Sequence, residues 1–277
     1  MLPEAKQKAL LYATSIGYIY VFEYPVGKFL GKIYDEHYPV GVCSDADGNV
    51  FVTDYGYAQI VEYAHGGTDP IRTLSDPQSD PRSCSIDPTT GNLAVANNDP
   101  GGVAIFPDAS GSPESYSPNL YYPNACAYDA DGNLFVDGES SKSGGFALSE
   151  LPRGGSTFSN IAVDQNIGGP GGLQWDGTYL ALEDGDVPDA IYQVAVSGST
   201  GRVVNTVTLG GPIDEPVGSQ FWIGSGKVIM PYEIKKEEFS PRRIGVWKYP
   251  GGGAPLKTRK PFRADHLWDV TVSVAPK

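Results

Sequence analysis

A motif that recurs at nearly constant spacing is the feature that most constrains the fold. Five copies each begin with a proline, and the successive prolines lie 42, 42, 47 and 46 residues apart. The copies read PVGVCSDADGNVFVTD (39–54), PRSCSIDPTTGNLAVAN (81–97), PNACAYDADGNLFVD (123–137), PGGLQWDGTYLALED (170–184) and PVGSQFWIGSGKVIMPYE (216–233). A period of this length indicates one supersecondary unit per copy, with each unit stacked on the next.

Each copy has the pattern of a small antiparallel sheet. A segment of small residues follows the proline, then a turn rich in Asp, Gly and Asn, then a segment such as Val-Phe-Val at 50–52. Asn and Gly tolerate the positive φ angles of tight hairpins. A third segment ends in aromatic residues, as in IVEYAHGG at 60–67, and a shorter fourth follows at 71–74. Four strands per copy predict the blade of a β-propeller.

The two ends of the chain complete the series. Residues 267–274 (LWDVTVSV) read as a first strand with no successors, and residues 10–33 read as second, third and fourth strands with no first. We therefore predict an all-β fold, a single domain over 1–277 that forms a six-bladed β-propeller with four antiparallel strands per blade. The blades begin near 39, 81, 123, 170, 216 and 267, and residues 10–33 complete the blade begun at 267–274. Pairing the ends removes open sheet edges.

The repeat also carries a family resemblance. The rhythm P-x-G-h-x-x-D-x-x-G-N-h-h-V-x-D, followed by I-x-x-Y-x-x-G, resembles the NHL-repeat propellers, which are related in shape to gluconolactonase-like propellers. The resemblance covers essentially the whole chain and implies the fold. It leaves the activity open, because NHL propellers serve as binding platforms, lyases and scaffolds.

Composition restricts the partners. A formal charge of −13 repels the phosphate backbone, so we expect no binding to nucleic acid. The apolar runs are too short for a membrane span. A small molecule, a carbohydrate or a protein remains as a partner, and we expect a monomer. Residues 1–8 (MLPEAKQK) lack the apolar core of a signal peptide, so the chain is either cytoplasmic or has lost a leader. Few Lys and many Tyr, Gly and Ser favour export.

When the copies are aligned, polar residues gather on one face of the predicted disc. This face is formed by the loops that enter the first strands and the loops that leave the second strands. The residues predicted there to bind a ligand are Tyr38, Asp80, Tyr122, Glu215, His266 and His37. A second set offers oxygen ligands for a divalent cation such as Ca²⁺, namely Asp54, Asn97, Asp137, Asp184, Glu233 and Asp269. The alternative is that each Asp accepts hydrogen bonds from backbone N–H groups of its own loop.

The histidines, the DADGN segments and the cysteines are the other candidates for catalysis or metal binding. His37 and His266 fall in equivalent loops beside acidic residues, which suits an acid–base or metal cluster, although exposed loop histidines without a task are the alternative. We expect His65 to be idle. The two DADGN segments, at 45–49 and 129–133, lack EF-hand spacing and are predicted turns. The three cysteines are predicted to be small buried side chains on first strands, without a disulfide framework: Cys43, Cys84 and Cys126.

The aromatic residues divide in the same way. Most tryptophans are predicted to pack between blades, and four tyrosines suit stacking on a sugar or aromatic ligand: Tyr38, Tyr55, Tyr57 and Tyr122. Sequence signatures of serine hydrolases, zinc peptidases and nucleotide-binding loops are absent. The leading interpretation is a binding or scaffold propeller that uses its acidic, Tyr-bearing face. The alternatives are a divalent-metal-dependent hydrolase or lyase, and a structural member of an extracellular assembly.

Overall fold

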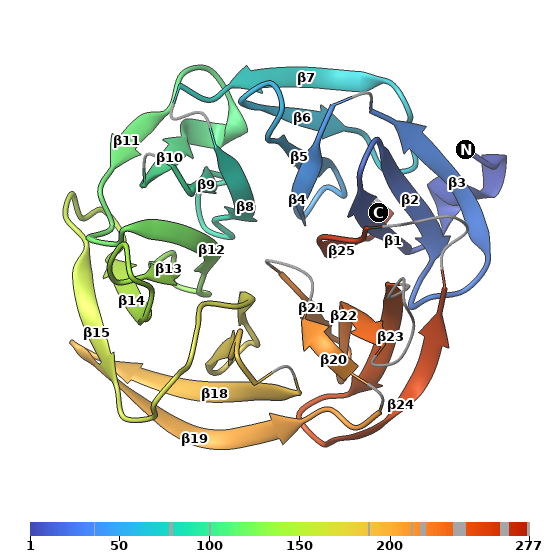
Figure 1. Ribbon diagram of the computed structural model, residues 1–277. Helices are drawn as coiled ribbons and strands as arrows, with labels where there is room; N and C mark the ends of the chain where they lie inside the picture. The colour runs from blue at the N-terminus through green and yellow to red at the C-terminus, as the bar shows by residue number, and fades with distance from the viewer. Residues whose placement is uncertain are drawn as a thin grey trace.

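The computed structural model describes residues 1–35, 37–77, 80–99, 101–187, 189–211, 213–216, 220–234, 242–260 and 266–275, without the side chains of 214–216. Its strands are grouped in sheets that radiate from a central axis, which is a β-propeller arrangement (Figure 1). Two short 3-10 helices, η1 (Pro3–Gln7) and η2 (Pro107–Ala109), accompany the strands. Within the described ranges no helix is long and apolar enough to cross a membrane.

Hydrogen bonding groups the strands into five sheets. Three sheets have four strands. The first contains β25 (Val270–Ser273), β1 (Leu10–Ser15), β2 (Tyr18–Glu23) and β3 (Phe29–Tyr34). The second contains β4 (Pro39–Ser44), β5 (Val50–Asp54), β6 (Gln59–Tyr63) and β7 (Pro70–Ser75). The third contains β8 (Pro81–Ile86), β9 (Leu93–Asn97), β10 (Gly102–Phe106) and β11 (Glu114–Tyr116).

The other two sheets are larger. An eight-stranded sheet holds β12 (Tyr122–Tyr128), β13 (Leu134–Glu139), β14 (Phe146–Leu151), β15 (Ser159–Val163), β16 (Leu173–Trp175), β17 (Leu180–Glu183), β18 (Ala190–Ser197) and β19 (Thr200–Thr208). Each half, β12–β15 and β16–β19, is antiparallel, and one parallel pair between β15 and β19 joins them. The last sheet holds β20 (Ile213–Pro216), β21 (Trp222–Gly224), β22 (Lys227–Ile234), β23 (Arg243–Lys248) and β24 (Gly252–Arg259).

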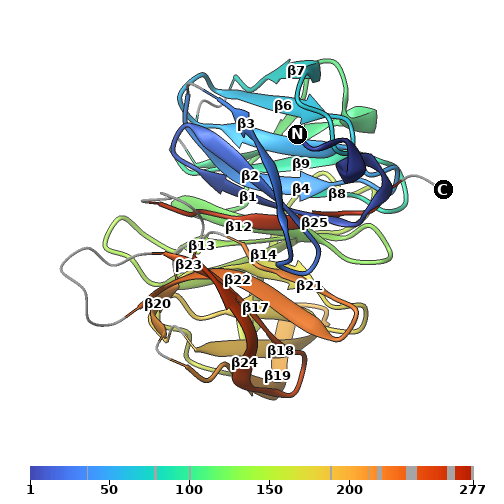
Figure 2. The same cartoon turned by 90° about the vertical axis from the view of Figure 1, so that its right-hand side faces the viewer.

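The two ends of the chain pair, as the sequence predicts. Strand β25 lies antiparallel to β1, with Leu10 opposite Ser273 and Ala13 opposite Val270 (Figures 1 and 2). His65 holds this junction from the neighbouring sheet, because its Nδ1 lies 2.6 Å from Ser273 Oγ and its Nε2 lies 2.9 Å from Lys8 O. The expectation that His65 is idle was therefore wrong. Its ring is buried against the chain ends rather than exposed in a loop.

The strands nearest the axis are irregular after their prolines. The pairing of β4 with β5 and of β12 with β13 shifts register beyond Pro39 and Pro123, which is the signature of a β-bulge. A bulge leaves a backbone N–H without its strand partner, and a side chain of the second strand accepts it. The backbone N–H two residues after the proline finds such an acceptor in three strand pairs, on β5, β13 and β17: Gly41 N donates to Thr53 Oγ1 (2.7 Å), Ala125 N to Asp137 Oδ1 (2.8 Å) and Gly172 N to Glu183 Oε2 (3.0 Å).

Apolar clusters fill the space between adjacent sheets, and they include the fully buried Trp247. The cysteines lie on β4, β8 and β12 and are buried, as predicted, yet Cys43 and Cys84 form a disulfide. No disulfide framework was expected from the sequence, so this bond was not predicted. The first strands of neighbouring sheets converge on the axis, and this brings the two Cα atoms to 5.7 Å, within the range of disulfide geometry. Cys126 is free and buried.

Candidate functional site

The loops that enter the first strands lie against the loops that leave the second strands. Backbone bonds join them in three sheets: Tyr55 N donates to Tyr38 O (3.0 Å), Asn98 N to Asp80 O (2.9 Å) and Gly185 N to Gly169 O (3.0 Å). We call the side of the disc formed by these loops the entry face. The opposite side carries the DADGN turns and is called the turn face. Asn49 N donates to Asp45 Oδ1 (2.7 Å) and Asn133 N to Asp129 Oδ1 (2.9 Å), so both segments are turns, as predicted.

A histidine sits between two buried carboxylates on the entry face. His37 Nδ1 lies 3.3 Å from Asp35 Oδ1 and 3.1 Å from Asp54 Oδ2, and its ring centroid lies 3.5 Å from that of Tyr57. Among the described residues, these three form the one group of His, Cys, Asp or Glu side chains close enough to share a metal ion. Asp54 also accepts bonds from Tyr38 N (3.2 Å), Gly56 N and Gln59 Nε2, so it shapes the entry loop as well.

An aromatic pocket of about 230 Å³ lies next to this histidine. Its walls are Tyr38, Val40, Tyr55, Arg82 and Trp268. The ring centroid of Tyr38 lies 6.0 Å from that of Tyr55 and 6.2 Å from that of Trp268, while the Arg82 guanidinium lies 5.8 Å from the Tyr55 centroid. Tyr38 and Tyr55 are 36% and 46% exposed, so the pocket opens to solvent.

Charged residues flank the aromatic pocket on two sides. Arg82 Nε lies 3.5 Å from Asp80 Oδ1. On the other side the Arg242 guanidinium lies 4.8 Å from the Trp268 ring, while its Nε donates to Glu233 Oε1 (2.7 Å). His266 stacks on Trp268 at 5.8 Å. Four of the predicted residues thus gather here: Tyr38, Asp80, His266 and Glu233. They surround Arg82 and Arg242, which the sequence analysis did not predict. Arg82 follows the repeat proline directly, and this position was the available signal.

The remaining predicted residues lie elsewhere. Asp184 accepts bonds from Gly168 N (3.1 Å) and Asp186 N (3.0 Å), so it caps a loop. Asp269 is fully buried and accepts bonds from Val42 N and Val270 N; burial raises the pKa of this carboxyl well above its usual value. Buried Asn97 donates from Nδ2 to Val95 O (3.5 Å), and Tyr122 packs on Tyr121 at 4.5 Å. The side chain of Glu215 lies outside the described part of the chain.

Asp137 occupies a different place from the one that the sequence alignment gave it. Pro39 pairs with Asp54 and Pro81 with Asn97, but Pro123 pairs with Gly138. Asp137 is therefore equivalent to Thr53 and Glu183. Each of these side chains accepts a hydrogen bond from a backbone N–H of the neighbouring first strand. Burial raises the pKa of Asp137 to about 7 and that of Glu183 to about 8. The alignment matched Asp with Asp at the end of each segment and could not detect the one-residue offset.

Comparison with known proteins identifies the fold. No family model matches the sequence. No curated protein matches it either. Among solved structures, a crystal structure of a nidogen/laminin complex contains a chain with a TM-score of 0.78 and 14% identity, covering 97% of this chain and 100% of that one. A protein of unknown function from Bacteroides caccae has a TM-score of 0.68 and 12% identity, covering 96% of this chain and 99% of that one. The fold is a β-propeller.

In this propeller the aromatic pocket spans the junction of three sheets. Tyr38 precedes β4, Val40 lies on β4 and Tyr55 follows β5 of the same sheet. Arg82 comes from β8, and Trp268 precedes β25. The sheets are fixed to each other by the Cys43–Cys84 disulfide and by the bond from Val42 N to Asp269. The pocket is therefore built on a rigid junction, although its lining residues lie far apart in the sequence.

Proposed function

We propose that this chain is a single-domain, six-bladed binding propeller whose entry face binds a protein partner through the aromatic pocket. The count of six takes each antiparallel half of the eight-stranded sheet as one blade. The resemblance of the repeat to NHL propellers supports this count and the role of a platform.

The composition of the pocket carries the proposal. Tyr, Trp and Arg are the residues most enriched at the energetic centres of protein–protein interfaces. Here Tyr38, Tyr55 and Trp268 present ring faces beside Arg82, and the paired Arg242 completes the rim. Charged pairs at the edge, Asp80 with Arg82 and Glu233 with Arg242, match the polar rim that surrounds such centres. An exposed cluster of this kind favours a protein or peptide over a phosphorylated ligand, which the net charge of −13 disfavours.

A peptide library displayed on phage and selected against the immobilised chain tests this proposal. Selected peptides should bind the wild-type chain and lose at least about tenfold in affinity to Tyr55→Ala, which removes one wall of the pocket. Ile71→Ala is the matched control, because Ile71 is 55% exposed on the outer strand β7. Peptides that bind both variants as well as the wild type would contradict the proposal.

One observation favours a second candidate, a divalent-metal-dependent hydrolase or lyase. His37 with Asp35 and Asp54 supplies one nitrogen and two carboxylate ligands, a set that suits Zn²⁺ or Mn²⁺. It suits Ca²⁺ less well, because Ca²⁺ takes about six to eight oxygen ligands. A bound ion would act as a Lewis acid. Calorimetric titration with each ion should show binding that His37→Ala removes; no heat with any ion would remove this candidate.

A further inference from the structure

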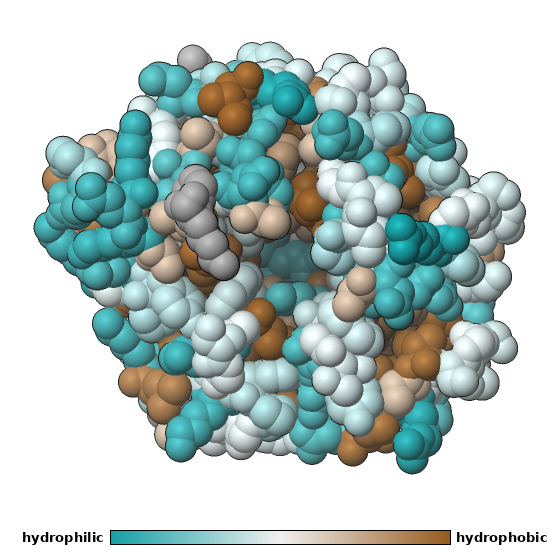
Figure 3. Space-filling model, turned by 180° about the vertical axis from the view of Figure 1, so that it is seen from behind, coloured by the Kyte–Doolittle hydropathy of each residue, from teal (hydrophilic) through white to brown (hydrophobic). Residues whose placement is uncertain are grey.

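The turn face of the propeller is hollowed at its centre (Figure 3). The hollow is a funnel of about 420 Å³ around the axis, and we call it the axial funnel. Residues at the ends of first strands line it, contributed by all five hydrogen-bonded sheets. Pockets of this volume accommodate small molecules. None of the residues that line the axial funnel takes part in the aromatic pocket of the entry face.

The lining of the axial funnel carries little charge. The described lining residues include no Lys, Arg, His or Glu, and their one carboxylate is that of Asp129. Asp129 is held in its own turn, because Oδ1 accepts from Asp131 N and Asn133 N while Oδ2 accepts from Asn133 Nδ2 (2.8 Å). An anionic ligand would find no counter-ion here. An uncharged ligand avoids that desolvation cost.

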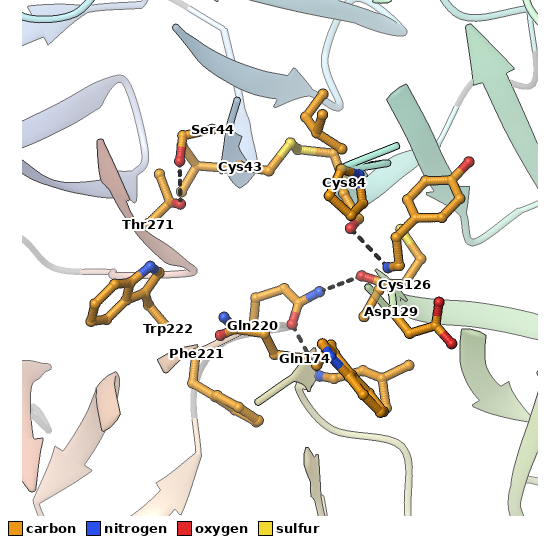
Figure 4. A pocket seen from close by; sticks show the side chains of 18 of the residues that line it. Cys43, Ser44, Cys84, Cys126, Asp129, Gln174, Gln220, Phe221, Trp222 and Thr271 are labelled. Atoms are coloured by element: carbon orange, nitrogen blue, oxygen red, sulfur yellow. Dashed lines mark hydrogen bonds between the residues drawn. A yellow bond between two sulfur atoms is a disulfide. The ribbon is translucent and has the colours of Figure 1, made fainter. Parts of the chain in front are cut away.

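Hydroxyl groups lie on one half of the wall, on β25, β4 and β8, and aromatic rings lie on the other half, on β12, β16 and β21. Trp175, Trp222 and Tyr128 supply flat apolar faces, and Ser44, Ser85 and Thr271 supply hydroxyl groups. Figure 4 labels Trp222, Ser44 and Thr271 among them. A hydroxyl group both donates and accepts hydrogen bonds, and those that line the funnel retain capacity beyond their bonds within the protein. A hydrocarbon ligand would leave this remaining hydrogen-bonding capacity unsatisfied, which costs binding free energy. A ligand with both C–H faces and hydroxyl groups matches the wall.

The wall is held rigid by cross-links between neighbouring first strands. Ser44 Oγ donates to Val272 O (3.0 Å), the disulfide joins Cys43 to Cys84, and Tyr128 N donates to Ser85 Oγ (3.1 Å). Gln174 joins the next pair, because its Oε1 accepts from Ile223 N and its Nε2 donates to Ile223 O. A site that is ordered before binding loses little conformational entropy when a ligand enters.

Gln220 extends across the axis at the inner end of the funnel (Figure 4). Its Nε2 donates to Ser83 Oγ and to Cys126 O, both at 2.9 Å, and its Oε1 accepts from Leu173 N at 3.0 Å. One amide group thus ties β8, β12 and β16 together. All three interactions use the polar atoms of a buried side chain, so Gln220 acts as a structural brace rather than as a ligand contact.

We propose that the axial funnel binds an uncharged carbohydrate of one or two sugar units. Pyranose rings present C–H faces to Trp175 and Trp222, and the sugar hydroxyl groups exchange hydrogen bonds with Ser44, Ser85 and Thr271. This site is separate from the protein-binding entry face, so the sugar-binding proposal can be tested independently of the function proposed above.

Tryptophan fluorescence of the whole chain tests this proposal. Two of the four tryptophans, Trp175 and Trp222, line the funnel, whereas Trp247 is buried and Trp268 lies on the entry face. Titration with a panel of neutral monosaccharides and disaccharides should give a saturable change in emission with at least one sugar, with a dissociation constant of about 1 mM or lower. The absence of saturable binding by every sugar would overturn the proposal.

Paired variants locate the site. Trp175→Leu removes the ring and should weaken binding at least about tenfold, whereas Trp175→Phe keeps a ring and should recover part of the affinity, as measured by calorimetry. Ser44→Ala provides a second test that leaves both rings in place, and it should weaken binding several-fold. Tyr55→Ala, on the opposite face, should leave sugar binding unchanged. Binding that survives Trp175→Leu and Ser44→Ala, or that is lost in Tyr55→Ala, would place the sugar elsewhere and overturn the proposal.

Discussion

At the scale of single residues, two repeats carry a buried carboxylic acid, Asp137 or Glu183, at the position where another repeat has Thr53. Glu183 is 3% exposed and its Oε2 accepts one bond, from Gly172 N. Burial raises its pKa from 4.5 to about 8, so the folded state favours the neutral acid. The stability that this group contributes is therefore complete below about pH 4.5 and is lost as the pH rises toward 8.

Glu183→Gln should change the pH dependence of stability. The amide keeps an acceptor for Gly172 N and cannot ionise. Relative to the wild type, the free energy of unfolding of the variant should rise between pH 4 and pH 9 by about 5 kcal/mol, because only the wild type must bury a charge. Urea unfolding of both proteins at several pH values measures this. A difference between the two that stays constant over the range would contradict the assignment.

The sequence predicts residue types at this scale better than residue roles. It placed Tyr38, Asp80, His266 and Glu233 on the entry face, where they surround the aromatic pocket. It did not distinguish the roles of two aspartates. Asp54 accepts a hydrogen bond from Tyr38 N in the entry loop, whereas Asp137 accepts one from Ala125 N at a β-bulge. That distinction depends on a register shift inside β12, and a β-bulge leaves no mark in the order of apolar and polar residues.

At the scale of elements, the first strands of adjacent sheets are joined by covalent and polar links that the sequence did not reveal. The spacing of turns predicted the strands because Gly and Asn tolerate positive φ, as at Gly48 and Gly132 in the two DADGN turns. The disulfide was missed because it depends on how closely β4 and β8 converge at the axis, which the linear spacing of cysteines cannot show. The parallel pairing of β15 with β19 was missed for a related reason. Contacts between outer strands depend on how closely neighbouring antiparallel units pack, and the sequence pattern does not show this.

Removing the disulfide should lower stability. Cys43 and Cys84 lie 41 residues apart, so in the loop-entropy treatment the double variant Cys43→Ser with Cys84→Ser loses about 4 kcal/mol of unfolding free energy. Cys126→Ala is the control that leaves the disulfide intact. Thiol titration of the denatured, unreduced wild-type chain should find one free cysteine. Three free cysteines, or a double variant as stable as the wild type in urea, would contradict the link.

At the scale of the whole molecule, closure depends on pairing β25 with β1. The sequence predicted this pairing from two incomplete sets of strands at opposite ends, which is an argument about missing neighbours rather than about any single residue. It did not predict what secures the junction. His65 reaches it from the adjacent sheet and contacts Ser273 on β25 and Lys8 just before β1. His65 therefore ties β25 and the segment before β1 to the adjacent sheet.

His65→Ala should therefore weaken the closed ring more than an ordinary loop substitution would. It leaves the Ser273 hydroxyl and the Lys8 carbonyl with one partner fewer in a buried place, which costs about 1–3 kcal/mol of unfolding free energy. Burial also lowers the pKa of His65, so the stability of the wild-type junction is complete above pH 6.5 and is lost as the pH falls below 6.5 toward the lowered pKa, and the variant lacks that dependence. Hydrogen exchange of the β1 and β25 amides at pH 5 and pH 7.5 reports on the junction directly. Protection of these amides should fall in the wild type at the lower pH and stay low in the variant at both; unchanged protection in the variant would show that closure rests on the strand pairing alone.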